Sequence, residues 1–323
     1  MRFAHADFVG KVARVLVLCV LPRESKPDVR RKDIVIARDF VQKVRAFETA
    51  AEQYAGVWHT VTWYDACLPL TMREDYYARV PTPNVNIEDA DVLVTGSAKR
   101  VGRVIALTLA DEGANVAIHY RTSDKAARET AEEVRERGGE AATVQNDLST
   151  VEGAHAAVDG TVDALGGIDV LVNSASVFSE TPVGDVTEED WNQNMDVNLR
   201  APFFASQLAA SHGAEKIINI AGVGAHRPFP SYLPYSVSKA GVVSLTKGLA
   251  KALAPETTVN AISPGTVLSP EDRSDEEERR IAEKTPVGRI GEPEDIADTV
   301  AFVVESSDFL NGAVINVDGG RSL

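Results

Sequence analysis

Cysteine is nearly absent from this 323-residue chain, because the only two, Cys19 and Cys67, fall in the first 71 residues. Residues 72–323 therefore hold no disulfide and no cysteine-based metal site, and we expect no bound metal. The apolar run 15–21 has seven residues, too few to span a bilayer, and lacks a small-residue cleavage site. We expect a cytoplasmic protein without a membrane partner.

Basic residues are scarce after residue 71. Residues 1–71 contain 11 Lys/Arg and 8 Asp/Glu, which leaves 22 basic and 40 acidic side chains, a net of −18, for residues 72–323. So acidic a surface argues against nucleic acid or an anionic membrane as the main partner. It also suggests adaptation to high salt, where ions screen self-repulsion, although many ordinary soluble enzymes are acidic.

Residues 1–71 carry no repeat and no motif with a chemical role, although 33–54 could form an amphipathic helix. We treat 1–71 as an N-terminal extension of uncertain role. One hypothesis is an over-extended reading of the gene, with Met72 as the true start. An intact mass matching all 323 residues would contradict that hypothesis. Residues 72–323 have the length of one catalytic domain.

Strand-like and helix-like segments alternate through this domain. Seven apolar segments predict strands at 92–95, 115–119, 142–145, 169–172, 216–220, 258–262 and 313–317. Helical patterns lie between them, at 126–137, 151–165, 187–198, 201–212, 235–254 and 294–305. This alternation predicts a single α/β domain, a Rossmann-type doubly wound parallel sheet with ligands at the strand C-terminal ends. The charged segment 272–280 is expected to be a solvated helix or loop over the site.

Gly96 and Gly102 follow the first predicted strand and precede a helix. Glycines there let the backbone turn tightly and approach a pyrophosphate, which the helix N-terminus stabilises. A glycine pair alone fits a ligand-free turn equally well.

Tyr235 and Lys239 lie four residues apart on a predicted helix, so their side chains share one face. An ammonium beside a phenol favours the phenolate, and we expect the tyrosine pKa to fall toward working pH. Such a tyrosine can exchange a proton with a carbonyl or imine. The spacing alone is common, and the upstream glycine loop gives it weight.

The cofactor preference is predicted from residues 119–123, which follow the second strand and contain no acidic side chain to mark NAD. Arg121, Ser123 and Arg100 can instead bind a 2′-phosphate, which predicts NADPH. The alternative is that Arg121 is an ordinary surface arginine.

Together these motifs resemble the short-chain dehydrogenase/reductase family over residues 89–323. The resemblance rests on Thr95-Gly96-x3-Arg100-x-Gly102, residues 173–176, Asn198, Tyr235-x3-Lys239, Pro264-Gly265 and residues 317–320. It implies an enzyme in which NADPH supplies a hydride, Tyr235 a proton, and Lys239 assists Tyr235 and holds the nicotinamide ribose. Asn198 would anchor a water that connects Lys239 to solvent. A homodimer or homotetramer is also implied, with faces formed by helices around 187–212 and 235–254.

The resemblance further implies which residues bind the cofactor. Asp147 and Leu148 would border the adenine, and Asn173 and Ala175 would approach the ribose, whereas Ser174 replaces the usual second asparagine. The full expected set is Gly96, Ser97, Arg100, Val101, Gly102, Arg121, Ser123, Asp147, Leu148, Asn173, Ala175, Tyr235, Lys239, Pro264 and Gly265.

Within the family, Arg100 and the segments 176–178, 227–235 and 284–289 look most like the pteridine reductase branch. Phe178 would then stack on a flat heterocycle while Ser176 bonds its polar edge. Phe178 could equally be a packing residue, and ketoacyl reductases share part of this pattern.

One position departs from the family. Thirteen residues before Tyr235, where relatives carry serine or aspartate, this chain has Gly222 at the substrate site. Loss of one positioned polar group commonly costs about 10²–10³ in rate, and a compensating group such as Ser231 or a water in the vacated space is not established.

Three functions therefore stay open. The first is NADPH-dependent reduction of a pterin-like or small carbonyl substrate. The second is a 3-oxoacyl thioester reductase or a sugar or alcohol dehydrogenase of the same family. The third is a catalytically impaired NADP(H)-binding protein.

Overall fold

The computed structural model describes residues 85–267 and 274–323. The predictions for residues 1–71 and for 272–273 lie outside the described residues. The described residues contain one parallel sheet of seven strands in the order β3-β2-β1-β4-β5-β6-β7. Its strands are β1 Asp91–Val94, β2 Asn115–Tyr120, β3 Ala141–Gln145, β4 Val170–Asn173, β5 Lys216–Ile220, β6 Thr258–Pro264 and β7 Val314–Val317.

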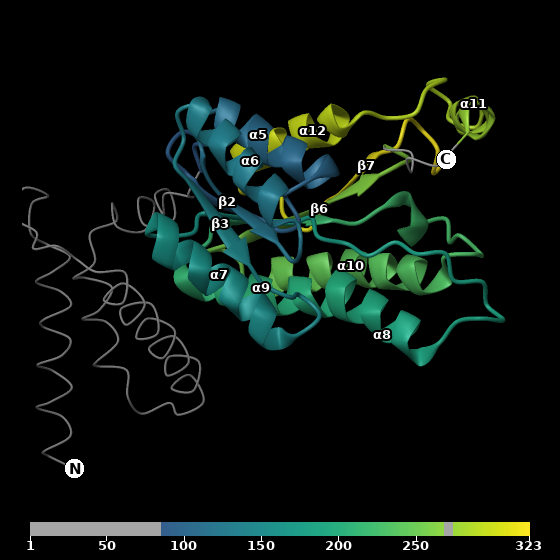
Figure 1. Cartoon of the computed structure of the whole chain (residues 1–323), viewed down its shortest axis with the longest axis horizontal. Coiled ribbons are helices and arrows are strands. Elements are labelled where there is room, and N and C mark those ends of the chain that lie inside the picture. Colours follow the sequence, from purple (N-terminus) through teal and green to yellow (C-terminus); the bar gives the residue numbers. More distant parts are fainter. Residues whose placement is uncertain (1–84, 268–273) are drawn as a thin grey trace, which may run out of the picture. The chain divides into compact units, whose positions relative to one another are not determined.

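Helices cover both faces of this sheet. Figure 1 shows α5 (Arg100–Asp111), α6 (Asp124–Glu136) and α12 (Pro293–Glu305) on one face. The other face carries α7 (Val151–Leu165), α9 (Ala201–His212) and α10 (Leu233–Ala252). The Rossmann-type prediction is confirmed, and the strand order reverses between β1 and β4, where this fold places its ligands.

Alternate residues of β1 serve the two layers. Val92 and Val94 are buried in the cluster that contains Ile105 of α5 and the apolar face of α12. Leu93 points the other way, into the cluster that contains alanines of α7 and α9. This is the period of two expected of a strand buried on both faces.

The predicted strands all form, with ends shifted by at most two residues. The longest shift extends β6 to Pro264 and so places the Pro264-Gly265 turn at the sheet edge.

The predicted helix 187–198 is divided in two. The first part is the α-helix α8 (Glu188–Met195), and a π-helical turn, η2 (Asp196–Arg200), follows it and contains Asn198. Such turns are rare and occur frequently at functional sites.

The charged segment after β6 forms α11, Asp275–Glu283. Ser274 and Glu277 form a capping box at the N-terminus of this helix. Among the described residues, no helix has the length and apolar character needed to cross a membrane.

Candidate active site

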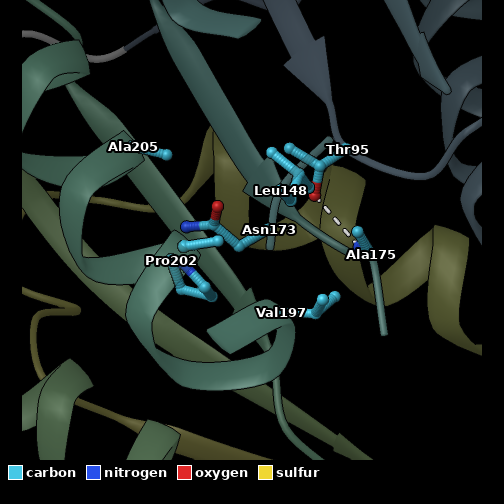
Figure 2. Close-up of a pocket in the computed structure, with 8 residues that line it drawn as sticks. Thr95, Leu148, Asn173, Ala175, Val197, Pro202 and Ala205 are labelled. Atoms are coloured by element: carbon cyan, nitrogen blue, oxygen red, sulfur yellow. Dashed lines mark hydrogen bonds between the residues drawn. The ribbon is translucent and has the colours of Figure 1, made fainter. Parts of the chain in front are cut away.

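The side chain of Thr95 joins the C-terminal ends of β1 and β4. Its buried Oγ1 accepts hydrogen bonds from the backbone N–H of Ser174 at 2.9 Å and of Ala175 at 3.0 Å. Figure 2 shows the Ala175 bond at a narrow hollow that Leu148 and Asn173 also line. Three predicted cofactor residues thus lie together where the strand order reverses.

Contacts within the protein require glycine at position 96, in the loop after β1, and at position 102, in the first turn of α5. Gly96 has φ +67°, and a methyl group there would lie 2.9 Å from Ala175 Cα. At Gly102 a methyl group would lie 2.5 Å from the Gly96 carbonyl oxygen. Both positions therefore need glycine for the loop to close, whether or not a ligand approaches it. Arg100 also has a positive φ of 56°, a conformation that non-glycine residues rarely adopt.

Two predicted cofactor residues turn their side chains into the protein. Ser97 is fully buried, and its hydroxyl donates to the Val94 carbonyl at 2.7 Å. The Asn173 amide donates to Ser206 Oγ at 3.2 Å and to Asn219 Oδ1 at 2.9 Å. The hydroxyl proton of Ser97 and the amide N–H groups of Asn173 are therefore used within the protein.

The end of β2 leaves cationic and hydroxyl groups exposed. Arg121 and Arg100 are exposed, and neither forms an ion pair with another residue of 85–267 or 274–323. Ser123 is the N-cap of α6, yet its hydroxyl makes no capping bond. Nearby Asp124 is occupied by Tyr120 and by Arg128, at 2.8 and 3.0 Å.

Asp147 follows β3 on the same side of the sheet. Its carboxylate accepts the Ser149 backbone N–H at 2.9 Å, and that bond lowers the pKa of Asp147. The side chain is thereby held ionised, close to the charge of Arg121.

Tyr235 and Lys239 lie on one face of α10, with Lys239 Nζ 5.7 Å from the centre of the Tyr235 ring. The Lys239 ammonium donates to the Ile220 carbonyl at 2.8 Å and is buried, which lowers its pKa to about 8. Burial raises the pKa of Tyr235 to about 12. The expected lowering of the tyrosine pKa is therefore wrong for this arrangement, because burial of the phenol disfavours its ionised form. A raised pKa keeps the phenol protonated at neutral pH.

Gly222 lies directly beside the Tyr235 hydroxyl. A methyl group at position 222 would lie 2.9 Å from Tyr235 Oη, so the hydroxyl already fills the space that a side chain would take. The expectation of a vacated space beside Tyr235 is thus wrong. Ser231 uses its carbonyl to accept the Thr181 N–H, and no bond from its side chain to Tyr235 is present in the described structure.

Asn198 connects the loop after β4 to the helix that carries Tyr235. Its Oδ1 accepts the Val177 N–H at 2.8 Å, and its Nδ2 donates to the Val177 carbonyl and to Ser238 Oγ, both at 3.1 Å. Ser238 in turn donates to the Tyr235 carbonyl. The amide of Asn198 therefore fixes the positions of both active-site segments, and Ser176 also donates to it.

Phe178 is half exposed and stacks on Tyr232, with ring centres 4.3 Å apart and planes 3° from parallel. The rings of Phe178 and Tyr235 meet in a T-shaped contact, with centres 4.7 Å apart and planes at 80°. A β-bridge between Thr181 and Tyr232 joins the same two loops. Phe178, Tyr232 and the Tyr235 ring therefore form an aromatic wall, and Phe178 is not part of the core.

Comparison with known protein families identifies the family to which the chain belongs. The family model described as enoyl-(acyl carrier protein) reductase matches residues 96–322. The chain is 36% identical, over 249 residues, to 3beta-hydroxysteroid dehydrogenase 1 of Eggerthella lenta, which covers 74% of this chain and 95% of that protein. This chain is a short-chain dehydrogenase/reductase.

Other relatives agree with this assignment. The 3-oxoacyl-[acyl-carrier-protein] reductase FabG of Staphylococcus aureus is 34% identical over 71% of this chain and 96% of that protein. Among solved structures, the promiscuous reductase LugOII has a TM-score of 0.69 at 33% identity, covering 74% of this chain and 99% of that one. A blue fluorescent protein from a metagenomic library, in complex with NADPH, has a TM-score of 0.69 at 31% identity, over 74% of this chain and all of that one.

The family consists of oxidoreductases that use a nicotinamide cofactor, so this chain is an oxidoreductase. The narrower likeness to pteridine reductases stays a prediction.

The C-terminal tail of this oxidoreductase packs against the Pro264-Gly265 turn. The Gly265 N–H donates to Val317, and a methyl group at Gly265 would lie 2.8 Å from Asp318 Cα. Arg227, in the loop after β5, donates to the Arg321 carbonyl at 2.5 Å. The Pro264-Gly265 turn therefore needs glycine because the tail packs against it.

Sequence reasoning missed two residues at this site. Tyr232 pairs with Phe178, and only the aromatic spacing 232–235 hinted at it. His119 has both ring nitrogens within hydrogen-bonding distance of cofactor-loop backbone. The signal for His119 was a polar side chain at the C-terminal end of the second predicted strand, where this fold places its ligands.

Proposed function

We propose that this oxidoreductase reduces a carbonyl or imine carbon with NADPH, with Tyr235 as the proton donor. The proposal rests mainly on the state of the Tyr235 hydroxyl. This hydroxyl has no hydrogen-bond partner among the described residues, and burial raises its pKa to about 12. A protonated, unengaged phenol is suited to donating to a substrate oxygen or nitrogen. When bound, the nicotinamide supplies the hydride.

The residues present fit a nicotinamide dinucleotide. Lys99, the N-cap of α5, makes no side-chain capping bond, so N–H groups at that helix N-terminus are left for a pyrophosphate. A 2′-phosphate of the cofactor can be bound by two exposed guanidinium groups, of Arg100 and Arg121, and by the Ser123 hydroxyl, which makes no capping hydrogen bond. One relative of similar structure was solved with NADPH. These observations support NADPH over NADH.

For the substrate, the aromatic wall favours a flat ring system. Phe178 presents an exposed ring beside Tyr235, and a planar pterin-like compound or ring ketone can pack against it. Two relatives are named for related chemistry, a 3beta-hydroxysteroid dehydrogenase and a reductase that acts in keto-reduction at C1 during lugdunomycin biosynthesis. Ser176 Oγ keeps lone pairs that can accept from the substrate edge.

A 3-oxoacyl thioester substrate is the second candidate. It is supported by the identity to the FabG reductase of Staphylococcus aureus over nearly its whole length. A linear acyl chain gains less than a flat ring from stacking on Phe178, so the two candidates differ in their dependence on that residue.

The test is NADPH oxidation with dihydropterins, quinonoid pterins, cyclic ketones, and short linear ketones and 3-oxoacyl thioesters, each at low and at molar salt. We expect turnover that prefers the planar substrates. Tight NADPH binding with no turnover of any of them would instead support the impaired NADP(H)-binding protein.

We also propose that residues 72–323 act as one catalytic domain in a cytoplasmic homodimer or homotetramer. Light scattering of residues 72–323 and of the full chain tests this, and a monomeric, active protein would contradict it.

A further inference from the structure

The imidazole of His119 lies between two loops that the cofactor would contact. His119 is near the end of β2 and only 3% exposed. Its Nδ1 accepts the backbone N–H of Gly96 at 3.1 Å, and its Nε2 lies 3.2 Å from the Asn146 carbonyl. Gly96 lies in the loop between β1 and α5, and Asn146 precedes Asp147 in the loop after β3.

These two contacts determine the tautomer. A backbone N–H can only donate, so Nδ1 carries no proton, and a carbonyl can only accept, so Nε2 carries one. The ring is therefore neutral. Burial agrees with this, because it lowers the pKa of His119 to about 4, even though the Asn146 bond and the charge of Asp147 oppose the shift.

His119 also holds the next peptide unit of the glycine loop. Its carbonyl accepts the Ser97 N–H at 3.0 Å, and its own N–H donates to Ser97 Oγ at 3.2 Å. Both peptide units that flank Gly96 thus donate to this one residue. Gly96 is in the left-handed conformation, where glycine has great freedom, so outside contacts must fix its orientation.

We propose that His119 is a positioning residue for the dinucleotide: its imidazole fixes the Gly96 peptide and holds the glycine loop at a set spacing from the loop after β3. Replacing it leaves the Gly96 N–H without its acceptor, and the loop must be ordered when the cofactor binds. This inference rests on the proposed cofactor site but not on the substrate.

The experiment compares His119→Ala, His119→Asn and His119→Gln in the full chain, with the dissociation constants of NADPH and NADH measured by fluorescence titration. Asparagine places an acceptor near the Nδ1 position, and glutamine a donor near the Nε2 position. We expect His119→Ala to weaken both dinucleotides by about tenfold, His119→Asn to restore most of the affinity, and His119→Gln to restore little.

Asn260→Ala is the matched control. Asn260 is equally buried, accepts one backbone N–H from Ala313 and donates to the Leu310 carbonyl, so it loses the same two kinds of bond. It should lower the unfolding temperature without changing either dissociation constant. Arg121→Ala should weaken NADPH alone.

The proposal is overturned if His119→Ala and Asn260→Ala behave alike, if His119→Asn is no better than His119→Ala, or if the parent binds neither dinucleotide. If His119→Ala does not fold, the difference between the asparagine and glutamine variants decides the question. A parent that binds NADPH but turns over no substrate would contradict the proposed reaction and leave this test intact.

Discussion

The two halves of the site are built differently. On the cofactor side, around β1, β2 and β3, polar groups such as Thr95, Ser97 and His119 are buried and hydrogen-bonded to backbone. On the substrate side, after β4 and β5, the Tyr235 hydroxyl has no partner in the described structure, and Phe178 is half exposed. On the cofactor side, buried polar groups hold the loops in shape and the exposed Arg100 and Arg121 remain for a ligand. The substrate side instead offers a phenol without a partner in the described structure and an exposed aromatic ring.

The largest expected effect is on the substrate side. Tyr235→Phe removes the free hydroxyl and keeps the ring against Phe178. We expect kcat to fall by about 10²–10⁴-fold, as for loss of a general acid, while the dissociation constant of NADPH changes less than threefold. Steady-state kinetics and fluorescence titration measure the two. An active variant would mean that another group donates the proton.

On the cofactor side, Gly96→Ala should destabilise the fold itself. The substitution adds left-handed strain to a contact of 2.9 Å with Ala175 Cα, and together these cost about 2–4 kcal/mol. Urea unfolding measures the change. Gly138→Ala is the control. Gly138 also has a positive φ of +98°, but an added methyl group there would have no atom within 4 Å, so this variant measures the backbone strain without the steric contact. Equal losses in both variants would contradict the packing argument.

Lys239→Met should increase the stability of the fold and nearly abolish activity. The folded state lowers the pKa of Lys239 to about 8, so the unfolded chain binds more protons between that pH and about 10.5. The stability of the parent should therefore rise with pH across this window and lose that contribution below it. We expect the variant to be more stable by about 1–3 kcal/mol at pH 7, nearly inactive, and flatter in its pH dependence. A parent with no pH dependence there would contradict the assigned pKa.

Gly222→Ser tests the position where the chain departs from its relatives. The new hydroxyl can share a substrate oxygen with Tyr235, provided the end of the tyrosine side chain gives by a few tenths of an ångström. We expect up to about a tenfold gain in kcat. Gly222→Ala crowds Tyr235 without adding a donor and should lower activity. If neither serine nor aspartate at 222 raises turnover, the proposed cost of this glycine is wrong.

The smallest expected effect comes from the aromatic wall. Phe178→Ala should raise KM for planar substrates by about 2–10-fold, the value of one ring contact, and leave short linear ketones unchanged. Phe309→Ala, which removes a fully exposed ring outside the site, is the control. An equal rise for linear substrates would argue against stacking.

Much of this architecture could be predicted from local patterns. Strand alternation and the Tyr235/Lys239 spacing predicted the sheet and the shared face of α10, because both depend on residues close in sequence. The direction of the Tyr235 pKa could not be predicted, since it depends on how much of the helix face other segments cover. For the same reason, the inward bonds of the Ser97 and Asn173 side chains could not be predicted, because their partners His119 and Asn219 are distant in the chain.

The bonds that Asn198 makes divide the substrate loop into a fixed and a variable part. Val177 is held at both its N–H and its carbonyl, whereas Glu180 and Val183, a few residues on, are exposed. A library aimed at new substrates can therefore vary the exposed residues 179, 180 and 182–185, while Thr181 is kept because it is buried and bridges to Tyr232. Val177, Asn198 and Ser238 should be left unchanged, so that each new loop starts from the same anchor beside Tyr235.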